Sequence, residues 1–205
     1  MAQKLKEETR AAILSAAKEE FEEKGYEDAS MRSIANKAGI TVGNIYRYFD
    51  NKEDLHKHIL SDTSEDLTKI LRKVNVDRLP IQPRVFGVKT DMEELKGMIE
   101  DVSSSLNDLY LKKESEFLIL LNDPEQSQPL KHWLDDTISK LLNQSYLMND
   151  RYRENEVLSH AYREACFEGI KDLFAHLQEG DDGKRLLYDY LYHFMKMIYE
   201  LESGN

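Results

Sequence analysis

Apolar and polar positions along the chain follow the period of an α-helix rather than that of a strand. Large apolar residues recur at steps of three and four, which places them on one face of each helix. This pattern predicts helices over residues 5–24, 52–74, 90–109, 114–121, 128–147, 155–178 and 183–202. Residues 75–89 hold two prolines and one glycine and lack a helical period, so we expect a seam in the fold there.

Two short helices are expected between the first two long ones. Ser30 and Thr41 are predicted N-caps, because their hydroxyl groups can accept hydrogen bonds from free amides of a first helical turn. Gly39 lies between them and can take the left-handed conformation that ends a short helix. Ile45 and Phe49 are four residues apart and are expected to face inward. The result is a helix-turn-helix, whose second helix has the width of the major groove of B-DNA.

The exposed face predicted for the second short helix carries groups that suit DNA. Asn44 can pair with a base edge, Tyr46 and Tyr48 can bind phosphates, and Gly43 leaves room for close approach. Lys52, at the start of the next helix, could reach a phosphate beside the free amides. The alternative is structural, since two short amphipathic helices around a glycine also occur in ordinary helical bundles.

Residues 9–55 resemble the tetracycline-repressor (TetR) family of bacterial transcription regulators. The positions that carry this resemblance are Ile13, Ala17, Phe21, Gly25, Tyr26, Ser30, Met31, Ile34, Ala35, Ala38, Gly39, Ile40, Thr41, Gly43, Ile45, Tyr46, Tyr48, Phe49, Lys52 and Leu55. The resemblance implies base contacts by Arg32, Val42, Gly43 and Asn44, and phosphate contacts by Thr41, Tyr46, Tyr48 and Lys52. It also implies dimerisation through the last two long helices.

The charge of the chain is strongly negative, at −11. This is unfavourable for DNA binding, where phosphate neutralisation supplies much of the affinity. Residues 1–60 are nearly balanced, however, with 10 Lys and Arg against 11 Asp and Glu. The basic residues expected near the reading helix are Lys4, Lys6, Arg10, Arg32, Lys37, Arg47, Lys52 and Lys57. We interpret them as a basic footprint on an acidic body.

The last two long helices are predicted to form an antiparallel hairpin that binds a second copy of the chain. The last helix carries two apolar stripes, and one chain can hardly cover both, so a two-fold symmetric four-helix bundle is expected. The alternative is a monomer with one wide core-facing stripe. The predicted interface residues are Ala161, Ala165, Gly169, Leu187, Tyr190, Leu191, Phe194 and Ile198.

An effector pocket is predicted among the helices that follow residue 90. Its expected lining is Leu106, Tyr110, Phe117, Trp133, Tyr162 and Cys166. We expect an apolar or aromatic effector, with a positive charge suggested by the ring faces and the acidic surroundings. The alternative is that these side chains fill a dry core.

Other chemistry has little support in the sequence. Gly-rich phosphate loops, Gly-x-Ser-x-Gly elbows and Cys-x-x-Cys pairs do not occur, and the six histidines lack metal-ligand spacing. We therefore expect no enzyme, no cofactor and no metal. No apolar run has the length of a membrane span, and the first residues lack the apolar core of a signal peptide, so a cytoplasmic protein is predicted.

Together these patterns predict an all-α homodimer. Residues 1–50 are expected to form a three-helix DNA-binding domain, and residues 51–205 a larger helical domain for dimerisation and effector binding. The predicted function is a transcriptional regulator, a repressor released from a palindromic DNA operator by a small effector. One alternative is a nucleoid or division protein that binds DNA on the same scaffold without an effector. A helical enzyme is the third class, which turnover of a metabolite would reveal.

Overall fold

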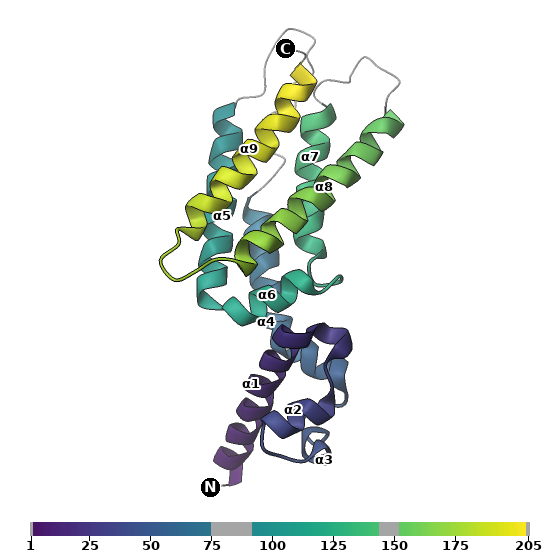
Figure 1. Cartoon of the computed structure of the whole chain (residues 1–205), viewed down its shortest axis with the longest axis vertical. Helices are drawn as coiled ribbons and strands as arrows, with labels where there is room; N and C mark the ends of the chain where they lie inside the picture. Colours follow the sequence, from purple (N-terminus) through teal and green to yellow (C-terminus); the bar gives the residue numbers. More distant parts are fainter. Residues whose placement is uncertain (1, 75–91, 144–151, 204–205) are drawn as a thin grey trace. The chain divides into compact units, whose positions relative to one another are not determined.

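The computed structural model describes residues 2–74, 92–143 and 152–203, and within these ranges the chain is helical without strands. The all-α prediction is confirmed. The helices are α1 (Ala2–Asp28), α2 (Met31–Lys37), α3 (Val42–Ile45), α4 (Lys52–Lys73), α5 (Met92–Lys112), α6 (Glu114–Asn122), α7 (Gln128–Asn143), α8 (Tyr152–Ala175) and α9 (Gly183–Ser203). Figure 1 labels them along the chain. The predicted seam at 75–89 lies outside the described residues.

The helices form two compact units. The first unit comprises Met1–Glu65 and Lys112–Gln126, and the second comprises Asp66–Leu111 and Ser127–Asn205. Helix α4 therefore contributes its first part to one unit and its last part to the other. Helix α6 belongs with the first unit because it packs against α1. The predicted functional division after Asp50 is a separate matter and stays a prediction.

The first unit is built on α1, which runs along α2 and α6. The backbone of α1 leaves the helical conformation at Gly25, where φ is 73° and ψ is 171°. A side chain with a Cβ atom rarely adopts this positive φ, so glycine suits the bend. The sequence pattern predicted that the helix ends directly before this bend, whereas α1 continues beyond it to Asp28. The core beneath consists of Ile13, Ala17, Phe21, Ile34, Ala35, Ile45, Phe49 and Leu55.

The second unit buries the apolar stripes of its long helices against one another. Helix α7 packs on α8 and α9, and α8 packs on α9. The Tyr190 hydroxyl of α9 donates to the carbonyl oxygens of Ala165 and Cys166, at 3.2 and 3.3 Å. A Cβ atom at Gly169 would overlap this hydroxyl, so the small residue allows the close approach of α8 and α9.

Helix α4 is tied to α7 in the second unit. The indole Nε1 of Trp133 donates to the carbonyl oxygen of Val74, directly after the end of α4, at 3.2 Å. Trp133 is only 5% exposed, so this hydrogen bond satisfies a buried donor and holds the end of α4 in place.

Candidate nucleic-acid interface

Two capped short helices form the predicted helix-turn-helix. The Ser30 hydroxyl accepts from the amide of Ser33 at 3.1 Å, and the Thr41 hydroxyl accepts from the amide of Asn44 at 3.3 Å. Gly39 has a φ of 68°, the left-handed conformation expected of it. Both predicted caps and the predicted helix stop are thus confirmed.

Helix α3 is shorter than expected. It ends at Ile45, and the chain continues as turns. The amides of Tyr48 and Phe49 both donate to the carbonyl oxygen of Ile45, at 2.8 and 3.1 Å. Ile45 and Phe49 are 0% and 1% exposed, so both face the core as predicted.

The predicted DNA-binding side chains keep accessible surface. Arg32, Thr41, Gly43 and Tyr46 are exposed, and Val42, Asn44, Tyr48 and Lys52 are partly buried. All belong to α2, α3 and the segments beside them within the first unit. Their individual contacts with bases or phosphates stay predictions.

A buried carboxylate fixes α2 against α1, a feature that the sequence analysis missed. The Glu20 side chain is fully buried, and its two oxygens accept from Lys24 Nζ at 2.8 Å and from Ser33 Oγ at 2.7 Å. Burial alone would raise the pKa of Glu20, but these hydrogen bonds more than offset it and lower the pKa to about 2. Its signal in the sequence was only an acidic residue on the apolar side of α1.

Three cations assigned to the basic footprint form ion pairs with carboxylates of the first unit, among them Lys4 with Glu8, and these pairs reduce the positive charge that they offer to DNA. Lys37 Nζ lies 3.1 Å from Glu19 Oε1 and 2.7 Å from Glu23 Oε2, so its charge joins α2 to α1. Lys57 pairs with Glu53 within α4. Among the described residues, exposed Arg32 makes no ion pair.

Lys52 has a structural role that was also missed. Its Nζ donates to the carbonyl oxygens of Tyr26, Glu27 and Ala29, at 2.6, 3.1 and 3.1 Å, and lies 4.4 Å from the centroid of the Tyr26 ring. These bonds use all three donors of the ammonium group and neutralise the carbonyl end of α1. A phosphate would have to replace one of them.

The predicted effector lining is divided between the units. Phe117 belongs to the first unit, and the other five residues belong to the second. Leu106 and Cys166 are 0% exposed and Trp133 is 5% exposed, which is the burial of core side chains. The effector pocket stays a prediction.

The predicted dimer interface is narrowed by burial. Leu187, Leu191 and Ile198 are all 0% exposed, because this stripe of α9 already packs within its own unit. These three residues therefore have no surface left for a partner. Ala161 and Ala165 remain exposed. Gly169, Tyr190 and Phe194 are partly buried, and Leu186 and Met197 add exposed apolar surface at 37% and 43%.

Neither a membrane helix nor a metal centre is evident in the ranges that the structure describes. No helix there is long and apolar enough to cross a membrane. No group of three or more His, Cys, Asp or Glu side chains in these ranges could hold a metal ion.

The arrangement of α2, α3 and their caps defines a helix-turn-helix protein. Residues 13–59 match the family model described as bacterial regulatory proteins, tetR family. The match takes in the helix-turn-helix and parts of the helices that flank it, so over this segment the chain is similar to TetR-family regulators.

Two curated relatives are similar to part of the chain. An uncharacterized HTH-type transcriptional regulator, YfiR of Bacillus subtilis, is 29% identical over 102 residues, which are 49% of this chain and 47% of YfiR. The HTH-type transcriptional regulator UidR of Escherichia coli K12 is 40% identical over 57 residues, which are 28% of this chain and 29% of UidR. The matched stretch thus spans less than half of either relative.

Solved structures show the fold over most of the chain. A TetR-family regulator from Bordetella parapertussis has a TM-score of 0.56 at 17% identity, covering 90% of this chain and 93% of that one. A TetR-like regulator from Rhodococcus sp. RHA1 has a TM-score of 0.52 at 18% identity, covering 96% of this chain and 97% of that one.

Proposed function

We propose that the chain is a DNA-binding transcriptional repressor that acts in the cytoplasm as a homodimer and leaves a palindromic operator when a small effector binds. The observation that carries this proposal is the capped α2–α3 pair, which lies inside the segment that matches the TetR family. A short rod of this width, with polar side chains on its free face, suits the major groove.

Side chains on the helix-turn-helix divide the work of recognition. Some of them contact base edges, which carry the sequence information, and others contact phosphates, which set the register of the protein on DNA. The base contacts are assigned to Arg32, Val42, Gly43 and Asn44, and the phosphate contacts to Thr41, Tyr46, Tyr48 and Lys52.

Dimerisation uses the surface that α8 and α9 leave uncovered. We assign Ala161, Ala165, Tyr190 and Phe194 to it, because each keeps accessible surface. Ala165→Glu should therefore yield monomers by light scattering, since it buries an unpaired charge in the interface. Ala175→Glu is the matched control, because it places the same charge on another exposed alanine of α8. An unaltered dimer in Ala165→Glu would remove this interface.

Helix α4 links an effector to the operator. Its first residue, Lys52, holds the end of α1, and the Val74 carbonyl oxygen after its last turn holds Trp133. An effector in the second unit that prefers one position of this end shifts the position of the reading helices in the dimer. The expected coupling is about 1–3 kcal/mol.

Selection from random-sequence duplex DNA tests the function. The expected result is an imperfect palindrome whose half-site centres lie about one helical turn, or a multiple of it, apart. Fluorescence anisotropy on that operator should then show weaker binding when an apolar or aromatic effector is added, together with quenching of Trp133. Salt-dependent binding without any sequence preference would contradict the proposal. Operator binding that no small molecule changes would favour the nucleoid or division protein.

A further inference from the structure

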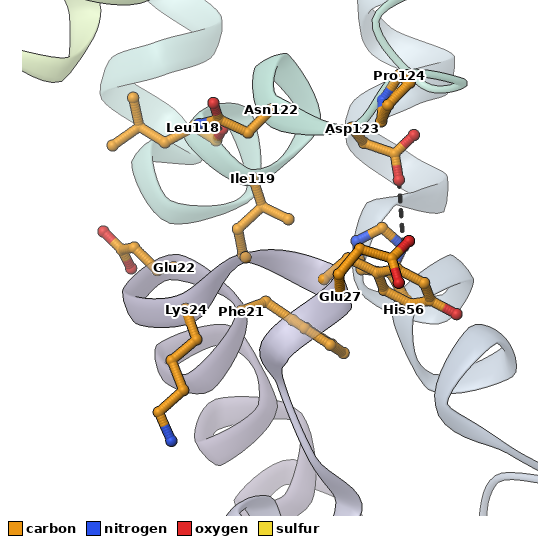
Figure 2. A pocket seen from close by; sticks show the side chains of 12 residues that line it. Phe21, Glu22, Lys24, Glu27, His56, Leu118, Ile119, Asn122, Asp123 and Pro124 are labelled. Carbon is orange, nitrogen blue, oxygen red and sulfur yellow. Dashed lines mark hydrogen bonds and ion pairs between the residues drawn. The ribbon is translucent and has the colours of Figure 1, made fainter.

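The first unit contains a cleft that the proposed function does not use. It has a volume of about 530 Å³ and lies between the end of α1, the first turns of α4 and the end of α6. Figure 2 shows side chains from all three elements around it. A volume in this range can accept a small organic molecule. Its apolar walls are Phe21, Tyr26, Leu118, Ile119 and Pro124.

His56 lines this cleft and carries an unsatisfied nitrogen. The residue is 5% exposed, and its Nε2 atom is buried without a hydrogen-bond partner. The ring is held edge-on to Phe21, with centroids 4.9 Å apart, and tilted to Tyr26, with centroids 4.7 Å apart. A buried polar atom without a partner costs stability, so such an atom in a cleft indicates a place for a ligand.

The surroundings of His56 decide which kind of group it can bind. Burial lowers the pKa of His56, Asp123 opposes this shift and Lys52 adds to it, so the neutral form of the ring is favoured. Its Nδ1 faces Asp123 Oδ2 at 3.6 Å, and the negative charge favours the proton on that nitrogen. Nε2 is then left with a lone pair and needs a donor.

The charge around the cleft favours a cation. Three carboxylates line it, those of Glu22, Glu27 and Asp123. The one lysine of the lining, Lys24, is paired with the buried Glu20. A positive group therefore enters a region of net negative charge.

We propose that this cleft binds a small organic ammonium ion with a flat apolar body, whose N–H donates to His56 Nε2. The apolar body packs on Phe21 and Ile119, and the ammonium charge lies among the carboxylates. The ring of His56 turns slightly to bring the buried Nε2 to the ligand. Such a site lies in the DNA-binding unit and is separate from the effector pocket predicted in the second unit.

Benzylammonium at pH 7.5 is a suitable probe, with the full-length chain. In NMR spectra of ¹⁵N-histidine-labelled protein, increasing benzylamine should shift the His56 ring signals to saturation. Benzoate has the same ring but the opposite charge and no donor, so it should leave them unchanged. Trp133 fluorescence should stay constant, because Trp133 belongs to the second unit. Failure to shift the His56 signals would overturn the proposal, as would an equal shift by benzoate.

Variants identify the atoms responsible. His56→Phe keeps a ring beside Phe21 and Tyr26 but removes Nε2, so affinity for benzylammonium should fall about tenfold or more. Asp123→Asn keeps the oxygen that accepts from the amides of Glu125 and Gln126, yet removes the charge, and should weaken binding similarly.

Glu125→Gln is the matched control, because it makes the same charge change on an exposed side chain outside the lining. It should leave the affinity unchanged. If His56→Phe does not fold, as judged by circular dichroism, the affinity of Asp123→Asn for benzylammonium decides whether the site exists. Affinity equal to that of the parent chain in Asp123→Asn would overturn the site. Operator binding measured without ligand tests the proposed function independently.

Discussion

The two compact units hold their helices together in different ways. In the first unit, single polar atoms set the positions of helices, as Glu20 does between α1 and α2 and Lys52 does between α4 and the end of α1. In the second unit, long apolar stripes on α7, α8 and α9 bury one another, with polar bonds such as that of Trp133 at their edges.

This difference explains where family resemblance is visible. Specific hydrogen bonds need particular residues at particular positions, whereas an apolar core tolerates many combinations of similar volume. The family match covers residues 13–59 of the first unit, while solved structures match the whole fold at only 17% and 18% identity. Similarity of sequence is therefore seen in the helix-turn-helix segment, whereas the rest of the chain shares mainly the fold with these structures.

Of the changes considered, removal of the buried Glu20 carboxylate should lower the free energy of unfolding most. Glu20→Ala leaves Lys24 and Ser33 without their shared acceptor, and we expect a loss of about 3 kcal/mol in the free energy of unfolding. Glu19→Ala, on a 60% exposed side chain, should cost less than about 1 kcal/mol. Urea denaturation measures both, and amide hydrogen exchange should show the loss in α2 rather than in α7. Equal losses of unfolding free energy in Glu20→Ala and Glu19→Ala would contradict a special role for the buried carboxylate.

Protonation of Glu20 is a milder form of the same change, because the side chain stays in place. Its pKa is lowered from 4.5 to about 2 in the folded chain, so the ionised form stabilises the fold fully above pH 4.5. This contribution should be lost as the pH falls from about 5 towards 2. Urea midpoints measured across this range should fall less steeply in Glu20→Gln, which cannot ionise. The same slope in both chains would contradict the assigned pKa.

In the second unit, a substitution that disturbs side-chain packing, rather than one that removes a charge, should lower the free energy of unfolding. Gly169→Ala places a Cβ atom against the Tyr190 hydroxyl, which must move and give up its bonds to Ala165 and Cys166. We expect the free energy of unfolding to fall by about 2 kcal/mol. Trp133 fluorescence during urea unfolding measures this change. Gly97→Ala is the control, since nothing lies within 4 Å of the new atom and helix propensity favours alanine. An unchanged free energy of unfolding in Gly169→Ala would show that α8 and α9 can move apart at this point without loss of stability.

Local patterns allowed much of the fold to be predicted from the sequence. Caps, glycine stops and apolar periods act over a few residues, which is why Ser30, Gly39 and Thr41 were assigned correctly. Contacts distant in sequence were not visible. The hydrogen bonds of the Lys52 ammonium to carbonyl oxygens 23 to 26 residues earlier in the chain were not predicted.

The apolar stripes of α9 show the same limit. Periodicity identified both stripes, but only tertiary packing decides which one the chain covers itself. Leu187, Leu191 and Ile198 are buried within the unit, while Leu186 and Met197 keep surface. The cleft at His56 likewise joins residues from three elements, and nothing local marks it.

The reading face of α3 is tested most directly by comparing two substitutions on one set of operator sequences. Asn44→Ala removes the proposed base contact, so it should cost about 1–3 kcal/mol on the preferred operator and change the ranking of operators. Tyr46→Phe removes only a hydroxyl from a 52% exposed ring, so it should weaken binding to all sequences by about 1 kcal/mol and keep the ranking. Fluorescence anisotropy at fixed salt measures both. A ranking left unchanged by Asn44→Ala would contradict the assignment of this face to DNA.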